Sequence, residues 1–207
     1  MSQPSVGAVE ESTFLDVFTD AIASLEREQI PYVLVGGIAA TAYGRDRWTA
    51  DIDVLVHAGD AERALEALAA GGFETERTNP QWIFKASREG VTVDVIFWMK
   101  GNVVLDDEML ERAREAEFHG VRARTAAPED VVVLKALAHD EQSPRHWGDA
   151  LGVLAACELD WDYLVRRARF GTRRVLSLLV YAESNDLVVP PRVVRGLFGL
   201  AYPQEEG

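Results

Sequence analysis

The chain has 207 residues, 48% of them hydrophobic and 27% charged, which is typical of a globular protein with a substantial core. Its formal net charge of −13 argues against a protein that is coated in nucleic acid through a basic surface. No apolar run reaches the ~20 residues of a membrane-spanning helix, and the start of the chain lacks a secretion signal. The chain also has a single cysteine, Cys157, so it cannot form an internal disulfide. These observations predict a cytoplasmic protein with no membrane partner.

Helical and extended patterns alternate along the first 127 residues, after a loose tail predicted at 1–9. Apolar residues at helical spacing indicate helices, whereas short apolar runs bounded by glycine or charged residues indicate strands. The predicted elements are a helix over 10–28, a strand over 31–35, a short helix over 38–43, a strand over 51–57, a helix over 60–70, a hairpin of strands over 82–85 and 91–97, a helix over 107–118 and a strand over 121–124. We therefore expect an α+β domain over residues 1–127.

The pattern changes at Pro128, where a proline followed by two acidic residues is typical of the first turn of a helix. The remainder predicts three to five helices, with breaks near Ser143-Pro144, Asp160, Gly171-Thr172 and Pro190-Pro191. Residues 128–207 are therefore expected to form an α-helical C-terminal region.

Two aspartates open the predicted strand over 51–57. Alternate side chains of a strand point to the same face, so the carboxylates of Asp51 and Asp53 lie side by side while Ile52 enters the core. Two such charges repel by roughly 3 kcal/mol at ~5 Å in an effective dielectric of ~20, and a bound cation relieves this repulsion. Because carboxylate oxygens suit hard divalent ions, the pair predicts a site for Mg²⁺ or Mn²⁺.

A glycine pair, Gly36-Gly37, separates the first strand from the short helix that follows. A dinucleotide-binding turn has a similar position but requires G-x-G-x-x-G, and Ile38 and Thr41 stand where its second and third glycines belong. The acidic residue of that fold also belongs near the end of the second strand, whereas Asp51 begins one. We interpret the pair instead as a place where backbone N–H groups approach a triphosphate at a helix start.

The glycine pair, thirteen intervening residues and then Asp51-Ile-Asp53-Val resemble the signature of the DNA-polymerase-β-type nucleotidyltransferase superfamily. The more local pattern Gly44-x-x-Arg47-x-Thr49-x-Asp51 is similar to its small bacterial branch, which includes AbiEii-type and MenT-type toxins. The resemblance covers about residues 30–155. It implies a nucleotidyltransferase fold, in which helices flank a mixed β-sheet and a following helical region completes the active site.

The same resemblance implies a role for each matching side chain. Asp51, Asp53 and Asp94, the last on the strand over 91–97, are implied as ligands of two Mg²⁺ or Mn²⁺ ions, with the third carboxylate also helping to activate an acceptor hydroxyl. Lys135 is implied as a contact to nucleotide phosphates, with Asp149 orienting either Lys135 or the loop around it. Relatives often carry an acid where this chain has His146, which puts the local hydrogen bonding in question.

The nucleoside triphosphate itself is implied to lie against the glycine pair and the loop after the short helix. The nucleotide-binding residues predicted there are Gly36, Gly37, Arg47 and Thr49, and Arg45 is a further loop arginine that could steady phosphates.

Other side chains have both a functional and an ordinary interpretation. A basic cluster is either a solvated pair of helix ends or an anchor for RNA phosphates, and it consists of Arg166, Arg167, Arg169, Arg173 and Arg174. Trp48 is the best candidate for stacking on a base, while Trp82 and Trp98 are expected in the core or in pocket walls. The four histidines lack metal-ligand spacing, so zinc is not expected.

Three functions remain open. The leading hypothesis is an enzyme that moves a nucleoside monophosphate from a nucleoside triphosphate to a hydroxyl of RNA, at the 3′ end of tRNA, as a toxin with an antitoxin partner. The alternative is modification of a small molecule such as an aminoglycoside, which suits an acidic protein at least as well. The third is a catalytically silent fold that serves as a binding module, but a silent copy has no need to keep three mutually repelling carboxylates.

Overall fold

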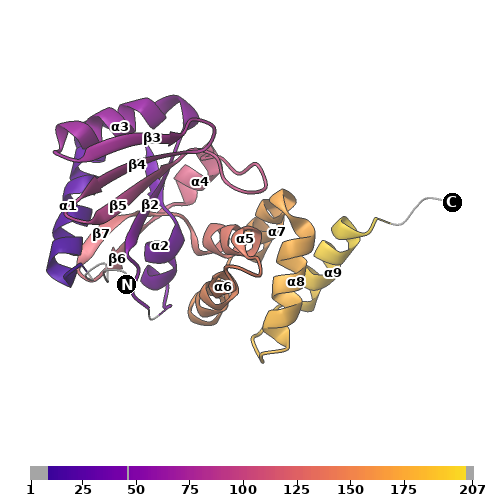
Figure 1. The fold of residues 1–207 in the computed structure, drawn as a ribbon. Helices are drawn as coiled ribbons and strands as arrows, with labels where there is room; N and C mark the ends of the chain where they lie inside the picture. Colours follow the sequence, from indigo (N-terminus) through magenta and orange to yellow (C-terminus); the bar gives the residue numbers. More distant parts are fainter. Residues whose placement is uncertain (1–8, 46, 204–207) are drawn as a thin grey trace, which may run out of the picture.

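The computed structural model describes residues 9–45 and 47–203, so the tail predicted at 1–9 lies almost wholly outside the described residues. Its centre is a mixed seven-stranded sheet, with α1 and α3 on one face and α5 to α9 extending from the other (Figure 1). The strands are β1 (Tyr32–Leu34), β2 (Asp51–Val56), β3 (Glu74–Asn79), β4 (Ile83–Arg88), β5 (Val91–Ile96), β6 (Arg114–Phe118) and β7 (Val121–Thr125). This confirms the predicted α+β class.

The helices alternate with strands in the first part of the chain and follow one another in the second. They are α1 (Glu11–Arg27), α2 (Gly36–Ala42), α3 (Ala61–Ala70), α4 (Asp107–Arg112), α5 (Pro128–Ala138), α6 (Arg145–Ala156), α7 (Trp161–Arg167), α8 (Thr172–Glu183) and α9 (Pro191–Ala201), with 3₁₀ turns at Ala58–Asp60 and Ala168–Phe170. None of the helices in the described part of the chain has both the length and the apolar character needed to cross a membrane.

The strand order β3-β4-β5-β2-β1-β7-β6 places the two strands that carry aspartates next to each other at the centre of the sheet. β2 and β5 run parallel, and Asp53 stands in register with Asp94. On the other side of β5, the antiparallel strand β4 places Lys85 in register with Asp94. Three charged side chains from three strands therefore lie in one row across the sheet, since residues in register point to the same face.

Alternation along β2 sends its side chains into two different environments. Ile52 and Val54 are buried in the cluster beneath α1 and α3. Leu55 is buried in the opposite cluster, which also contains Val33 and residues of α5 to α9. Asp53 is two residues before Leu55 and therefore points to the same face of the sheet, so its carboxylate faces α2 and the C-terminal helices. The predicted boundary at 127/128 lies where α5 begins, and this second cluster contains residues from both sides of it.

Two elements differ from the prediction. The helix predicted over 107–118 ends at Arg112, and Arg114–Phe118 forms strand β6 in a hairpin with β7. The turn between them has positive φ at His119 (47°) and Gly120 (86°), which matches the twist of a tight hairpin. Strand β3 was not predicted, because its Glu-Thr-Glu-Arg-Thr-Asn sequence is polar throughout and lies exposed at the sheet edge.

Candidate active site

The predicted carboxylates gather on the face of the sheet that is covered by α2 and α5. Asp51 is exposed, and Asp53 and Asp94 are half-buried. The Nζ atom of Lys85 lies 2.5 Å from Oδ1 of Asp94, an ion pair that sequence reasoning missed. Only the register of β4 against β5 brings this lysine to the site, so no local pattern could have revealed it.

Gly36 and Gly37 are required because their backbone lies very close to the side chains of the site. Gly36 has φ +66°, and a Cβ atom built on it would lie 1.8 Å from Oδ2 of Asp53. A Cβ atom on Gly37 would lie 2.4 Å from Oγ1 of Thr49 and 3.2 Å from Nη2 of Arg47. The space beside Asp53 and Thr49 therefore exists only because neither position has a side chain.

We expect that Gly36→Ala impairs the site far more than a glycine substitution elsewhere. The new methyl group would displace the Asp53 carboxylate, and positive φ adds about 1 kcal/mol of strain or more. Gly72→Ala is the matched control, because Gly72 also has positive φ (+86°) but open space around it. Nucleotide transfer by Gly36→Ala should fall by about tenfold or more relative to Gly72→Ala, whereas equal activities of the two variants would refute this reading of the glycine.

The electrostatics of Asp53 fit a divalent cation. Burial, together with the charges of Asp94 and Asp51, raises the pKa of Asp53 to about 6, although Lys135 and the Gly37 N–H group oppose this shift. The raised pKa means that the surrounding side chains do not fully stabilise the ionised form of Asp53. A Mg²⁺ or Mn²⁺ ion bound to the carboxylate would supply the missing positive charge. Within residues 9–45 and 47–203, no cluster of three or more histidine, cysteine or acidic side chains has the arrangement of a formed metal site.

Asp149 of α6 holds the loop before β2 against the C-terminal helices. Its two carboxylate oxygens accept hydrogen bonds from Nε (2.8 Å) and Nη2 (2.9 Å) of Arg47, and Oδ2 also accepts one from Nζ of Lys135 at 2.7 Å. Nε of Arg45 lies 3.7 Å from Oδ1. Asp149 itself is fully buried, with 0% exposure. Asp149 therefore contacts both Lys135 of α5 and the loop before β2.

The charges of this cluster compensate one another. Burial lowers the pKa of Lys135, and the hydrogen bond and charge of Asp149 oppose that change. Burial alone would raise the pKa of Asp149, but the hydrogen bonds from Arg47 and Lys135 hold it below its usual range. Asp149 therefore stays ionised between the two cations, and Lys135 remains available at the wall of the cavity.

A cavity of about 270 Å³ brings the predicted residues together, and we call it the carboxylate cavity. It is lined by Val35, Gly36, Gly37, Arg47, Thr49, Asp51, Asp53, Asp94, Ile96, Met99, Leu134, Lys135, Ala138, Arg145 and His146. All the predicted catalytic, metal-binding and nucleotide-binding residues are in this lining except Asp149, which lies buried behind Arg47 and Lys135, whereas the further candidate Arg45 is not in it. The apolar wall was not anticipated, because its residues have the spacing of any other core positions.

His146 is the departure from the family motif, and the structure places it at the cavity wall. Its Nδ1 atom is buried and has no hydrogen-bond partner among the described residues. Burial, followed by the charges of Lys135 and Arg145, lowers the pKa of His146 to about 4. The imidazole is therefore neutral at physiological pH.

A depressed histidine pKa makes stability depend on pH. The unfolded chain takes up a proton near pH 6.5, whereas the folded chain resists it until about pH 4, so stability is lost as the pH falls through this window. We expect the wild type to lose about 2 kcal/mol more unfolding free energy than His146→Gln between about pH 7.5 and about pH 4.5. Urea denaturation of both proteins at the two pH values measures this, and parallel losses would contradict it.

Two predictions about individual side chains are corrected by the structure. Arg167 is 1% exposed and pairs with Asp130 and Asp106, so it cannot anchor RNA phosphates on the surface. Trp48 is absent from the carboxylate cavity and packs in an aromatic cluster, 5.1 Å from the ring of Phe14 and 5.8 Å from that of Phe118. It is therefore not placed to stack on a nucleotide base.

Solved structures with the same fold include several nucleotidyltransferases. The antibiotic-resistance factor ANT(2'')-Ia has a TM-score of 0.54 at 16% identity, over 86% of this chain and 95% of that chain. A nucleotidyltransferase-like antigenic protein from Paracoccidioides brasiliensis has a TM-score of 0.53 at 16% identity, over 90% and 93%. The lincomycin-bound lincosamide antibiotic adenylyltransferase LnuA has a TM-score of 0.50 at 14% identity, over 72% and 99%. At these identities the likeness shows the fold alone.

No curated protein sequence matches this chain. Residues 8–183, by contrast, match a protein family described as "Uncharacterised nucleotidyltransferase". This range begins before α1 and ends with α8, so it includes both the sheet and most of the C-terminal helices. The chain therefore belongs to this family of transferases and is a member of the nucleotidyltransferase superfamily.

Proposed function

We propose that the carboxylate cavity transfers a nucleoside monophosphate from a nucleoside triphosphate to an acceptor hydroxyl. One observation carries this proposal: Asp51, Asp53 and Asp94 line the same cavity as Lys135 and the side-chain-free surface of Gly36. In a silent binding module, the half-buried carboxyl group of Asp53, whose pKa is raised by burial and by neighbouring carboxylates, would have no function.

In the proposed reaction, the acceptor hydroxyl oxygen forms a bond to the α-phosphorus while the bond from that phosphorus to the pyrophosphate oxygen breaks. Lys135 and Arg47 provide positive charge for the phosphates, and the glycine pair lets the backbone approach them closely. The hydroxyl proton passes to a carboxylate, for which we propose Asp94, held in place by Lys85. The β- and γ-phosphates leave together as pyrophosphate, and the α-phosphate stays on the acceptor as a phosphodiester.

The residues that would hold a divalent metal ion are Asp51, Asp53 and Asp94. Bound Mg²⁺ or Mn²⁺ would neutralise phosphate charge and promote ionisation of the acceptor hydroxyl. The helical region over 128–207 is proposed as the second part of the active site, since it supplies Lys135, Arg145, His146 and Asp149.

For the acceptor we propose the 3′ end of an RNA, with tRNA as the first candidate. Of the basic cluster, Arg166, Arg169, Arg173 and Arg174 remain exposed in the structure, although Arg166 pairs with Glu108 at 2.9 Å. The toxin role and an antitoxin partner are supported by the motif resemblance only, and a small-molecule acceptor is the alternative outcome of the test.

The test is to incubate the protein with each radiolabelled nucleoside triphosphate, Mg²⁺ and either total tRNA or a panel of aminoglycosides. Label on RNA that disappears when Asp53 is replaced by asparagine supports the proposal. Label on a drug would select the small-molecule alternative instead. Absence of any transfer, together with no metal-dependent nucleotide binding, would reject both.

A further inference from the structure

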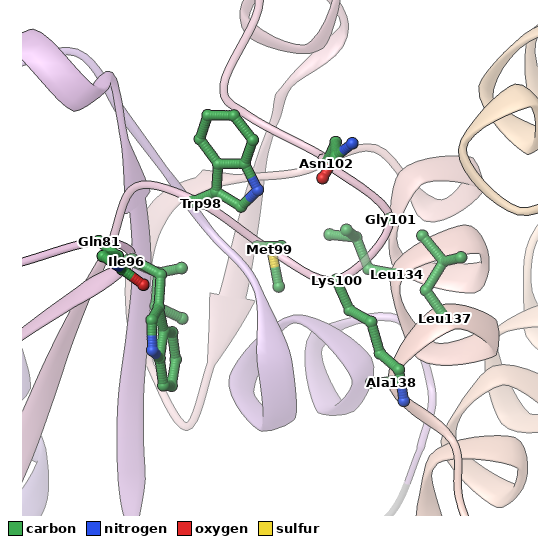
Figure 2. A pocket seen from close by; sticks show the side chains of 11 residues that line it. Gln81, Ile96, Trp98, Met99, Lys100, Gly101, Asn102, Leu134, Leu137 and Ala138 are labelled. Carbon is green, nitrogen blue, oxygen red and sulfur yellow. The ribbon is translucent and has the colours of Figure 1, made fainter. Parts of the chain in front are cut away.

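A second cavity, of about 680 Å³, lies beside the carboxylate cavity, and we call it the tryptophan cavity. Its lining is Gln81, Trp82, Ile96, Trp98, Met99, Lys100, Gly101, Asn102, Leu134, Leu137 and Ala138. Figure 2 shows Ile96 on the strand side and Leu134 and Leu137 on the helix side, with Met99 between them. Four of these residues, Ile96, Met99, Leu134 and Ala138, also line the carboxylate cavity. The two cavities therefore adjoin along one apolar wall.

A third cavity, of about 450 Å³, continues this series, and we call it the arginine cavity. It shares Lys100, Gly101 and Leu137 with the tryptophan cavity. Beyond this shared part it is lined by Arg173, Arg174 and residues of α9. The chain thus presents carboxylates, then aromatic rings, then basic side chains in one continuous order along its surface.

The side chains of Trp82 and Trp98 are unusually exposed for tryptophan. Trp82 is 44% and Trp98 is 46% exposed, although large aromatic side chains are normally buried well beyond that. Rings of this kind are suited to stack on planar groups such as nucleobases. The amide groups of Gln81 and Asn102 stand beside them and offer hydrogen bonds.

The charge of the lining distinguishes between classes of acceptor. The tryptophan cavity contains Lys100 and no acidic residue, and the arginine cavity adds Arg173 and Arg174 and again no acidic residue. Nζ of Lys100 lies 3.9 Å from Oδ2 of Asp140, but both side chains are exposed. The linings of the two cavities add only Arg173 and Arg174, so a polycationic aminoglycoside would meet an excess of positive charge. A single strand of nucleic acid has a negatively charged phosphate at each nucleotide, which the lysine and the two arginines complement.

Neighbouring groups contact both arginines of the arginine cavity. Nη1 of Arg174 donates a hydrogen bond to the carbonyl oxygen of His139 at 2.5 Å, and Arg173 lies over the ring of Tyr202, 5.1 Å from its centroid. Within the described part of the chain, neither arginine has a carboxylate within salt-bridge distance. Both therefore remain available to a phosphate.

The order of the cavities also agrees with the direction of the reaction. The triphosphate is proposed to lie against Gly36, Gly37 and Arg47, and none of these lines the tryptophan cavity. In an in-line displacement the entering hydroxyl approaches the phosphorus from the side opposite the leaving pyrophosphate. The tryptophan cavity adjoins the carboxylate cavity at Ile96, the last residue of β5 and two residues beyond Asp94, so we assign it to the entering acceptor.

We propose that these three cavities form one trough for a single-stranded polynucleotide end. The terminal 3′ hydroxyl lies at Asp94, the last bases stack on Trp82 and Trp98, and the phosphates behind them contact Lys100, Arg173 and Arg174. This inference rests on the proposed function, because it assigns the acceptor to the same site. Of the predicted anchor it keeps only Arg173 and Arg174, and it adds Lys100, which the sequence does not place near them.

The test measures binding in the absence of nucleotide, so that it does not depend on catalysis. The probe is a 5′-fluorescein single-stranded RNA of about six nucleotides with a free 3′ end, followed by fluorescence anisotropy. The double variant Trp82→Ala/Trp98→Ala should bind about tenfold or more weakly. Lys100→Ala/Arg174→Ala should reduce the slope of log affinity against log salt by about 1.4, since each phosphate contact adds ~0.7 on a single strand.

Matched controls exclude general effects. Phe198→Ala removes an aromatic ring that is 58% exposed outside the trough, and Arg122→Gln removes an exposed cation on β7, which lies beyond β1 and next to the edge strand β6. Both should bind the probe like the wild type. Thermal melting verifies that the variants fold, and Trp82→Leu/Trp98→Leu, which keeps an apolar surface without a stacking face, repeats the test if the alanine variant unfolds.

The outcomes separate this inference from the proposed function. If the tryptophan and cation variants bind the probe like the wild type while RNA is still labelled, the trough is wrong and the transfer stands. If binding depends on the trough residues but no transfer occurs, the proposed function fails and the trough stands. Displacement of the probe by an aminoglycoside, or no binding of RNA at all, would overturn the trough.

Discussion

Replacing Asp53 with asparagine is expected to lower the rate of nucleotide transfer by about 10³-fold. Asparagine keeps the shape of the side chain beside Gly36 but removes the charge that a metal ion needs. The rate is measured in the tRNA-labelling assay at saturating triphosphate. Asp16→Asn makes the same chemical change on the exposed face of α1 and should leave the rate within about twofold.

The same substitution should not destabilise the protein. The raised pKa of Asp53 means that its ionised form is disfavoured in the fold, so a neutral side chain removes a penalty at neutral pH. The midpoint of thermal unfolding without added metal should therefore stay the same or rise. A full loss of transfer in a variant that melts normally identifies Asp53 as part of the chemistry. A rate close to that of the wild type would remove Asp53 from the reaction.

Arg167→Met is expected to lower the free energy of unfolding by about 3–5 kcal/mol. Nε of Arg167 lies 2.7 Å from Oδ1 of Asp130, and both side chains are 1% exposed. Nη1 also lies 2.5 Å from Oδ2 of Asp106, and Tyr163 donates a hydrogen bond to Asp130 at 2.6 Å. Removal of the guanidinium would leave the Asp130 carboxylate buried without its cation, which is the costly case for an ion pair.

Arg166→Met is the control for this prediction, because Arg166 is the adjacent arginine and its side chain is 48% exposed. An exposed pair such as Arg166 with Glu108 contributes about 0–1 kcal/mol, so this variant should unfold nearly like the wild type. Urea denaturation compares the two. Adding Asp130→Leu to Arg167→Met should recover part of the loss, since it removes the stranded charge. Equal stability of the two single variants would disprove the structural role of Arg167.

Local patterns were sufficient to predict most of the fold and the polar part of the site. The helical spacing of apolar residues located α1 and α3, and the charged turn Arg88-Glu89-Gly90 located the hairpin of β4 and β5. The Gly-Gly and Asp-x-Asp spacing pointed to Asp53 and Gly36. In the structure these two residues are so close that a side chain on Gly36 would clash with the Asp53 carboxylate. These features follow from the sequence because each depends on residues that are close together along the chain.

Where local signals were ambiguous, the prediction failed. Arg114–Phe118 has the composition of a helix but pairs as a strand, because β7 follows it directly across a tight turn. The arginines of the basic cluster look equivalent in the sequence, yet Arg167 turns into the core toward Asp130. Which side of a helix faces another helix depends on packing between segments that are far apart in sequence.

The sequence by itself determined the family of this protein and the candidate residues of its site: a glycine pair, three carboxylates and a lysine. Only the tertiary structure decided what surrounds them. It brought Lys85 to Asp94 and Asp149 to Arg47, and it placed Trp98, Lys100 and Arg174 in the linings of two adjoining cavities. The physical reason is that strand register and helix packing juxtapose side chains at separations along the chain that no local pattern records.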